Sequence, residues 1–123
     1  MQDLAGRVLT VRKQGTGRFM LPGGKPEPGE DALSTAVREV AEELGVELVP
    51  QEMRDLGVFT TWAANEAGTT LVASVFEHGF VAGARPCAEI AELRWVPLTA
   101  GPSPELAPLT WEVLELLRQR QAG

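Results

Sequence analysis

The sequence predicts a single domain of the α/β (α+β) class, in which helices flank a mixed central sheet. The chain has 123 residues, enough for one hydrophobic core and too few for a second folded unit, so residues 1–123 are treated as one domain. Segments rich in β-branched and aromatic residues lie on both sides of residues 31–44, which contain neither Gly nor Pro. Strands with a helix between them and another at the end favour an α/β/α sandwich.

Strands are expected where Val, Ile, Thr and aromatic side chains are concentrated. The expected strands are residues 7–12, 46–49, 56–63, 69–76 and 93–96, with a shorter candidate at 19–21. A hairpin turn is expected at residues 65–68. Prolines and glycines fill six of the eight positions of residues 22–29, so this segment is predicted to be a loop.

Two helices are predicted from apolar side chains that recur at helical spacing. The first covers residues 31–44 and ends at Gly45, a typical C-terminal stop. Its apolar face is predicted to consist of Leu33, Val37, Val40, Ala41 and Leu44. The second covers residues 110–120, and its face is predicted to consist of Val113, Leu114, Leu116 and Leu117.

The composition limits the classes of function. A net charge of -6 argues against broad binding to nucleic acids or membrane surfaces, since both need a basic surface. No apolar run approaches the roughly 18 residues of a membrane span. The N-terminus lacks the features of a signal peptide and Cys87 is the only cysteine, so a cytoplasmic location is expected.

Three carboxylates gather on the first predicted helix. On a helical wheel, Glu39, Glu42 and Glu43 fall in an arc of about 100° opposite the apolar face. Their mutual repulsion is offset within the helix only by Arg38, so a divalent cation is the expected partner. Mg²⁺ is suited to a few carboxylates together with water and substrate phosphates. The alternative is an acidic helix face exposed to solvent, which is common.

The loop and helix together carry a family motif. Residues 24–46 resemble the Nudix box, G-x5-E-x7-R-E-U-x-E-E-x-G-U, in which U is aliphatic. All nine specified positions are filled, by Gly24, Glu30, Arg38, Glu39, Val40, Glu42, Glu43, Gly45 and Val46. The segments around residues 21–23 and 94–96 are also similar to this family. The resemblance implies a Nudix-type sandwich.

The resemblance also implies an activity, which is hydrolysis of a diphosphate linkage in a nucleoside diphosphate joined to another group X, with Mg²⁺ or Mn²⁺. Glu42 and Glu43 would be metal ligands, and Glu39 a ligand or the base that activates water. The Gly23 carbonyl would be a further ligand. Arg38 would orient Glu39, and Glu30 would steady the loop and helix.

Other site residues are less closely specified. Glu89 is the favoured additional catalytic acid, and its alternative is a carboxylate in a solvated loop. Substrate phosphates could contact basic residues near the loop, namely Arg12, Lys13, Arg18 or Lys25. Phe19, Phe59, Trp62 and Phe76 are aromatic, and Trp62 is favoured for contact with a base because it is near a loop.

Two rival functions stay open. The same fold could be a sensor that binds a nucleotide or ADP-ribose without catalysis, although a sensor does not need all three helix carboxylates. An acidic protein-interaction domain is the third reading. The family usually has a full strand ahead of residues 6–12, where this chain has only residues 1–5. The start therefore looks truncated, or a second protomer completes the sheet in a homodimer.

Overall fold

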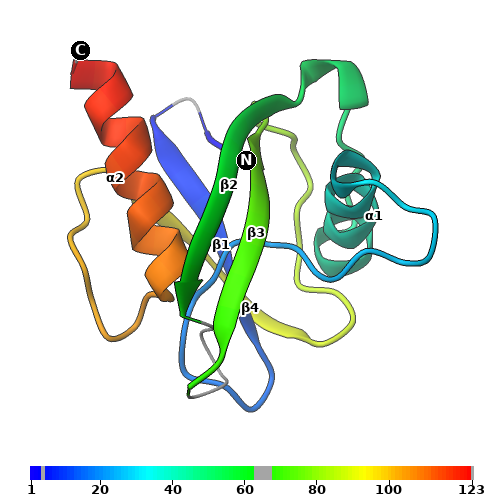
Figure 1. The fold of residues 1–123 in the computed structure, drawn as a ribbon, viewed down its shortest axis with the longest axis horizontal. Helices are drawn as coiled ribbons and strands as arrows, with labels where there is room; N and C mark the ends of the chain where they lie inside the picture. The colour runs from blue at the N-terminus through cyan, green and yellow to red at the C-terminus, as the bar shows by residue number, and fades with distance from the viewer. Residues whose placement is uncertain (4, 63–67, 123) are drawn as a thin grey trace.

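The computed structural model describes residues 1–3, 5–62 and 68–122. Its strands are β1 (Arg7–Lys13), β2 (Arg54–Trp62), β3 (Thr70–Glu77) and β4 (Ile90–Pro97). Its helices are α1 (Ala32–Leu44), the short 3₁₀ helix η1 (Pro50–Glu52) and α2 (Pro108–Ala122). In Figure 1 the strands form a layer between α1 on one side and α2 on the other. The predicted α/β/α sandwich is therefore confirmed.

The strand layer consists of two antiparallel ladders. β1 pairs with β4 and β2 pairs with β3. Within the described residues, no strand of one ladder is hydrogen-bonded to a strand of the other. The candidate strand at residues 19–21 is reduced to isolated bridges: Met20 pairs antiparallel with Val11, and Phe19 pairs parallel with Leu106.

Residues 1–3 lie between the two ladders and are bonded to both. On the β1 side, the Leu9 amide donates to the Met1 carbonyl over 3.0 Å. On the β3 side, the Gln2 amide donates to the His78 carbonyl, which follows the end of β3, over 3.0 Å. The amino group of Met1 is buried, and this burial lowers its pKa.

The two faces of the strand layer have separate hydrophobic cores. The core under α1 joins Leu9, Val11, Val40, Leu44, Val46, Leu48 and Ile90. The core under α2 includes Val8, Phe19, Leu56, Val75, Val96, Val113, Leu114 and Leu117. Neighbouring residues of β1 thus contribute to opposite cores, as the alternation of side chains along a strand requires.

The ends of α1 agree with the prediction. The Asp31 side chain accepts a hydrogen bond from the Ser34 amide over 2.8 Å, which makes Asp31 the N-cap. Gly45 has a φ of 69° and its amide donates to the Ala41 carbonyl. This way of ending a helix uses a residue in the left-handed backbone conformation, which favours glycine.

The predicted apolar face of α1 needs a correction. Val40 and Leu44 are buried and Val37 packs beside them, but Leu33 is only half-buried and lies outside both cores. Thr35 and Glu43 are buried instead. The buried arc is rotated toward the loop before the helix, in which Gly23 contacts Glu43 and Gly24 lies against Glu39. Of the three carboxylates, Glu42 is the exposed one.

The strand predicted at residues 46–49 is wrong. This segment is irregular and leads into η1, in which Pro50 occupies a first-turn position. Val46 and Leu48 are buried while Glu47 and Val49 are exposed. The alternation that suggested a strand thus comes from packing against the core under α1, without a ladder partner among the described residues.

The remaining elements follow the prediction with different ends. β4 begins three residues before the predicted strand, and α2 extends past both predicted ends. The predicted face of α2 is confirmed, because Val113, Leu114 and Leu117 are all buried. Most of the predicted hairpin turn at residues 65–68 lies outside the described residues.

The corrected α1 face gives a prediction on stability. Leu44 has no exposed surface, so Leu44→Ala should lower the free energy of unfolding by about 2–5 kcal/mol. Leu33→Ala removes the same atoms from a half-buried position and should cost about 1 kcal/mol or less. Urea denaturation of both variants measures the difference. Equal losses would mean that the helix packs on its predicted face.

Candidate active site

The loop before α1 is tied to the helix through Glu30. This carboxylate accepts hydrogen bonds from the Glu27 amide over 3.0 Å and from the Thr35 hydroxyl over 2.8 Å. It also accepts two bonds from the Arg38 guanidinium, at 2.8 and 2.9 Å. These donors, Arg38 first, lower the pKa of Glu30 to about 2. Glu30 is therefore ionised and joins loop to helix, as expected of the motif acid.

Arg38 is the hub of the helix surface. Besides Glu30, its guanidinium donates to the Glu39 carboxylate over 2.8 Å and to the Lys25 carbonyl over 3.1 Å. A longer contact of 3.3 Å reaches Glu42. The resemblance implies that Arg38 orients Glu39, and its contact with Glu39 is shorter than its contact with Glu42.

Gly24 lies against the Glu39 carboxylate. A Cβ atom at position 24 would lie 2.5 Å from the carboxyl carbon of Glu39, closer than real Cβ atoms come to other groups. The loop can approach the helix this closely only because residue 24 has no side chain. This contact is a physical reason for glycine at the first position of the motif.

Glu43 is the buried carboxylate of the group, with only 3% of its surface exposed. One oxygen, Oε1, accepts a hydrogen bond from the Gly23 amide over 3.1 Å. The other oxygen, Oε2, is buried without a hydrogen-bond partner among the described residues. A buried acceptor without a partner is costly, so this atom indicates a missing cationic or donor partner.

The electrostatic environment of Glu43 connects it with the rest of the site. Its pKa is raised to about 7, mainly by burial and in addition by the nearby carboxylates of Glu39 and Glu89. The Gly23 amide and the Lys13 ammonium act in the opposite direction. Glu39, Glu89 and Lys13 thus all act on Glu43, although the four residues come from three separate parts of the chain.

Glu89 is carried to this place by the backbone before β4. The Gln14 amide donates to the Glu89 carbonyl over 2.8 Å, and the Cys87 amide donates to the Glu43 carbonyl over 2.9 Å. The Glu89 side chain is 64% exposed and its carboxylate lies 3.4 Å from the Lys13 ammonium. The favoured additional acid is therefore beside the helix group.

The donor set fits a hard divalent cation. It consists of carboxylate oxygens, one of which is the buried Oε2 of Glu43. Across residues 1–3, 5–62 and 68–122, however, no group of three His, Cys, Asp or Glu side chains converges on one point. The reason is that Arg38 holds Glu39 and Glu42 while Glu43 turns to the Gly23 amide.

A cleft with a volume of ≈ 440 Å³ is lined by Gly23 and Gly24, the loop residues that contact Glu43 and Glu39, whereas Glu39, Glu42, Glu43 and Glu89 themselves do not line it. Its walls come from the loop before α1, the inner side of α1, β3 and α2, and Lys13, Gly23, Gly24, Lys25 and Trp62 line it. Trp62 is 60% exposed. The cleft is large enough for a small ligand and its walls are mostly apolar.

The cleft separates the predicted substrate contacts into two groups. Lys25 and Trp62 line it, whereas Arg12 and Arg18 do not. Arg12 is bound to the Glu92 carboxylate over 2.9 Å and to the Thr16 carbonyl over 2.9 Å. Among the other aromatic candidates, Phe76 lines the cleft, Phe59 packs on the core under α2, and Phe19 is buried in that core.

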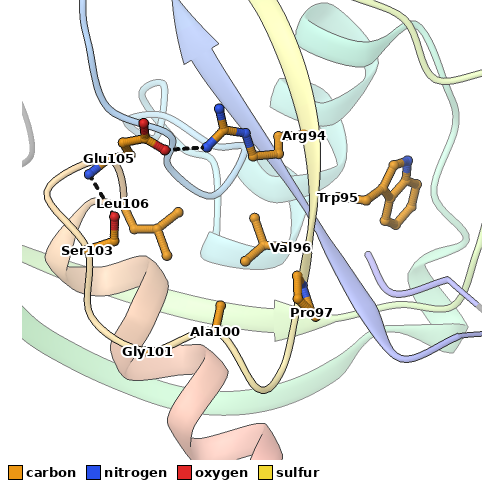
Figure 2. Close-up of a pocket in the computed structure, with 9 residues that line it drawn as sticks. All are labelled: Arg94, Trp95, Val96, Pro97, Ala100, Gly101, Ser103, Glu105 and Leu106. Carbon is orange, nitrogen blue, oxygen red and sulfur yellow. Dashed lines mark hydrogen bonds and ion pairs between the residues drawn. The ribbon is translucent and has the colours of Figure 1, made fainter.

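A second hollow lies between the end of β4 and the segment that leads to α2 (Figure 2). Its volume is ≈ 240 Å³. The Arg94 guanidinium, which borders it, is 2.8 Å from the Glu105 carboxylate and 4.0 Å from the centre of the Phe19 ring. Glu105 and Phe19 already contact the Arg94 guanidinium, and no residue of α1 lines this hollow. The hollow is therefore not part of the acidic site.

The sandwich and the loop with its acidic helix define a Nudix-type domain, and comparison with known proteins agrees. The NUDIX domain model matches residues 1–117. Human 8-oxo-dGDP phosphatase NUDT18 is 28% identical over 123 residues, which cover 96% of this chain and 36% of that protein. The solved MutT NUDIX hydrolase of Burkholderia pseudomallei is 31% identical, with a TM-score of 0.73 over 89% of this chain and 87% of that one.

The chain belongs to the Nudix family. The solved MutT protein of Methanosarcina mazei Go1 shares the fold over 99% of this chain and 90% of its own, with a TM-score of 0.81 at 24% identity. The chain spans about a third of the length of the curated relatives it matches, 36% of one and 33% of the other.

The buried carboxylate gives a prediction on pH. The pKa of Glu43 rises from 4.5 to about 7 on folding, so the folded protein binds this proton more tightly than the unfolded chain. The stability from Glu43 is complete below about pH 4.5 and is lost as pH rises through 7. In a chelator, the melting temperature should therefore fall between pH 5 and pH 8.

Glu43→Gln should flatten this part of the profile, because glutamine has no proton to lose in that range. Glu47→Gln is the control, since Glu47 is exposed on the segment that follows α1. Thermal unfolding monitored by circular dichroism gives the readout. A Glu43→Gln profile as steep as that of the wild type would show that another group causes the loss of stability.

Proposed function

We propose that this domain is a pyrophosphohydrolase that cleaves a diphosphate linkage in a nucleoside diphosphate joined to another group X. The observation that carries the proposal is Oε2 of Glu43, which has no hydrogen-bond partner among the described residues and lies near the charges of Glu39 and Glu89. The other oxygen of Glu43 is bound to Gly23, which lines the cleft. A bound cation would stabilise the buried Oε2, and a cation near a cleft can also bind the oxygens of a polyphosphate ligand. Mg²⁺ is the proposed cofactor, and Mn²⁺ has the same preference for oxygen ligands.

The helix carboxylates divide the work in this proposal. Glu42 and Glu43 are metal ligands together with the Gly23 carbonyl, and Glu39 is a ligand or the base that accepts the proton of the attacking water. Arg38 is a positioning residue, because its 2.8 Å contact fixes the Glu39 carboxylate. The bound metal would stabilise the negative charge that develops on the phosphates.

Glu89 is proposed as the further acid of the site, on the strength of its effect on Glu43. On the substrate side, Lys25 and Trp62 line the cleft and would contact phosphate and base respectively. Arg12 is a weaker candidate for contact with the substrate than Lys25 or Trp62, because its guanidinium is bound to Glu92. Arg18 likewise lies away from the cleft lining.

The name of one relative supports a class of substrate. Oxidised nucleotides are the first candidates, since the human relative is named an 8-oxo-dGDP phosphatase, and nucleoside triphosphates stay beside them as the second candidates. The alternative is a sensor with the Nudix fold that binds a nucleotide or ADP-ribose without cleaving it. The buried Glu43 favours the enzyme, because a sensor gains nothing from a carboxylate whose burial destabilises the fold at neutral pH.

The other properties proposed for the protein concern its surroundings. No helix of the described residues is both long and apolar enough to cross a membrane. The net charge is -6, and an acidic protein is poorly suited to bind nucleic acids or membrane surfaces. We therefore propose small nucleotides as its partners, neither nucleic acid nor membrane, and a cytoplasmic location. The homodimer also stays a proposal: among the described residues β2 is the one ladder partner of β3, although the Gln2 amide bonds to His78 just past the end of β3.

A substrate panel tests the enzymatic proposal. It consists of nucleoside triphosphates, oxidised nucleotides, dinucleoside polyphosphates, ADP-ribose and nucleotide sugars with Mg²⁺, followed by product analysis. The wild type should cleave at least one of them, and Glu42→Gln should lower kcat by a factor of about 100 or more. Glu47→Gln should leave kcat unchanged. Binding without cleavage, or equal cleavage by Glu42→Gln, would favour the sensor.

Glu89 has a separate test. Glu89→Gln keeps the shape of the side chain and removes its charge, so turnover with Mg²⁺ should fall by a factor of about 10 or more if the acid takes part. Since Glu89 is mostly exposed, the melting temperature should change little. Normal turnover would place Glu89 among ordinary solvated carboxylates.

A further inference from the structure

Lys13 faces α1 from the end of β1. Leu9 and Val11 belong to the core under α1, and alternation along the strand puts Lys13 on the same side. Arg12 points the other way and is bound to Glu92. The two basic neighbours therefore differ in role, and only Lys13 lines the cleft.

The backbone fixes where the Lys13 side chain begins. The Lys13 carbonyl accepts hydrogen bonds from the Thr16 amide over 3.1 Å and from the Thr16 hydroxyl over 2.8 Å. The ladder with β4 shifts register between Arg12 and Lys13, so that Lys13 is opposite Ile90. Irregularities of this kind redirect side chains near functional sites. Glu89 directly precedes Ile90, and its carboxylate lies 3.4 Å from the Lys13 ammonium.

Two cations thus flank the acidic group, and they are held very differently. Arg38 makes several short contacts with Glu30 and Glu39. Lys13 makes one contact of 3.4 Å with Glu89, whose side chain is 64% exposed, and is itself 33% exposed. A single ion pair of this kind contributes little to stability, so Lys13 can leave it at low cost. Arg38 cannot move without releasing the loop.

The positive charge of Lys13 acts on Glu43, the carboxylate that is a proposed metal ligand. Its ammonium stabilises the ionised form of Glu43, whereas Glu39 and Glu89 oppose that form. The Oε2 atom of Glu43 remains without a hydrogen-bond partner within the described residues. Lys13 therefore offsets part of the negative field without occupying the position next to this oxygen.

We propose that Lys13 is a displaceable counter-ion of the acidic site, which holds the Glu89 side of the group before a divalent cation binds and then turns to the substrate. This inference rests on the proposed function. The Lys13 ammonium would be repelled by a divalent cation bound at the carboxylates and would then leave Glu89 for the cleft, which it lines. There it contacts a diphosphate oxygen. Lys13 should consequently oppose binding of the metal and favour binding of the diphosphate.

The opposite signs of these two effects make the inference testable without turnover. In Lys13→Met, titration calorimetry with Mg²⁺ alone should give a Kd lower by a factor of about 3–10, because a repelling charge is gone. With Mg²⁺ saturating, the non-hydrolysable probe methylene diphosphonate should bind about 10-fold more weakly. Lys13→Arg should behave like the wild type in both titrations.

Arg7→Met is the matched control, because Arg7 is also an ion-paired basic residue of β1, bound to Asp3 at the other end of the strand. It should change neither Kd. Weaker or unchanged Mg²⁺ binding by Lys13→Met would overturn the counter-ion role alone. Absence of Mg²⁺ binding by the wild type would overturn the proposed function and this inference with it.

Discussion

The Arg38 guanidinium connects the loop to the helix, and the geometry of the acidic site depends on this connection. Glu30 closes it from the loop side with two short hydrogen bonds, and Glu39 receives the remaining short bond on the helix side. Gly24 then packs on the Glu39 carboxylate where no other residue would fit. Four motif positions thus form one contact network, and these contacts give a physical reason for the spacing of the four residues in the motif.

Much of this network could be predicted from the sequence, because its parts are local. The helix and its glycine stop follow from periodicity and from the conformational freedom of Gly45, and both are confirmed. The burial of Glu43 could not be predicted. A helical wheel shows which residues share a side of the helix, but it does not show that the preceding loop covers part of the polar side. The strand predicted at residues 46–49 is wrong for a related reason. Alternating burial shows that one side of a segment faces the core, but a strand also needs a neighbouring strand to pair with.

The residues outside the motif required the three-dimensional structure. Arg12 and Lys13 are adjacent and both basic, so the sequence offers little reason to prefer either. The strand turns one toward Glu92 and the other toward α1. Glu89 is favoured from the sequence because the family that the sequence resembles often has a further acidic residue in a loop after the box, whereas its proximity to Glu43 depends on backbone contacts at Gln14 and Cys87. Arrangements of this kind depend on pairings between distant segments, which periodicity does not encode.

The pairing of β1 with β4 also has a consequence for the entropic cost of forming the site. Glu30 and Arg38 are eight residues apart, so the loop and helix can come together early in folding. Arg12 and Glu92 are 80 residues apart, and closing so long a segment costs chain entropy before any ladder contact offsets it. The side of the site that holds Lys13 and Glu89 therefore bears the larger entropic cost of closure. A partly unfolded chain in which β1 and β4 have separated would lose the contact between Lys13 and Glu89, while Glu30 and Arg38 would stay close along the chain.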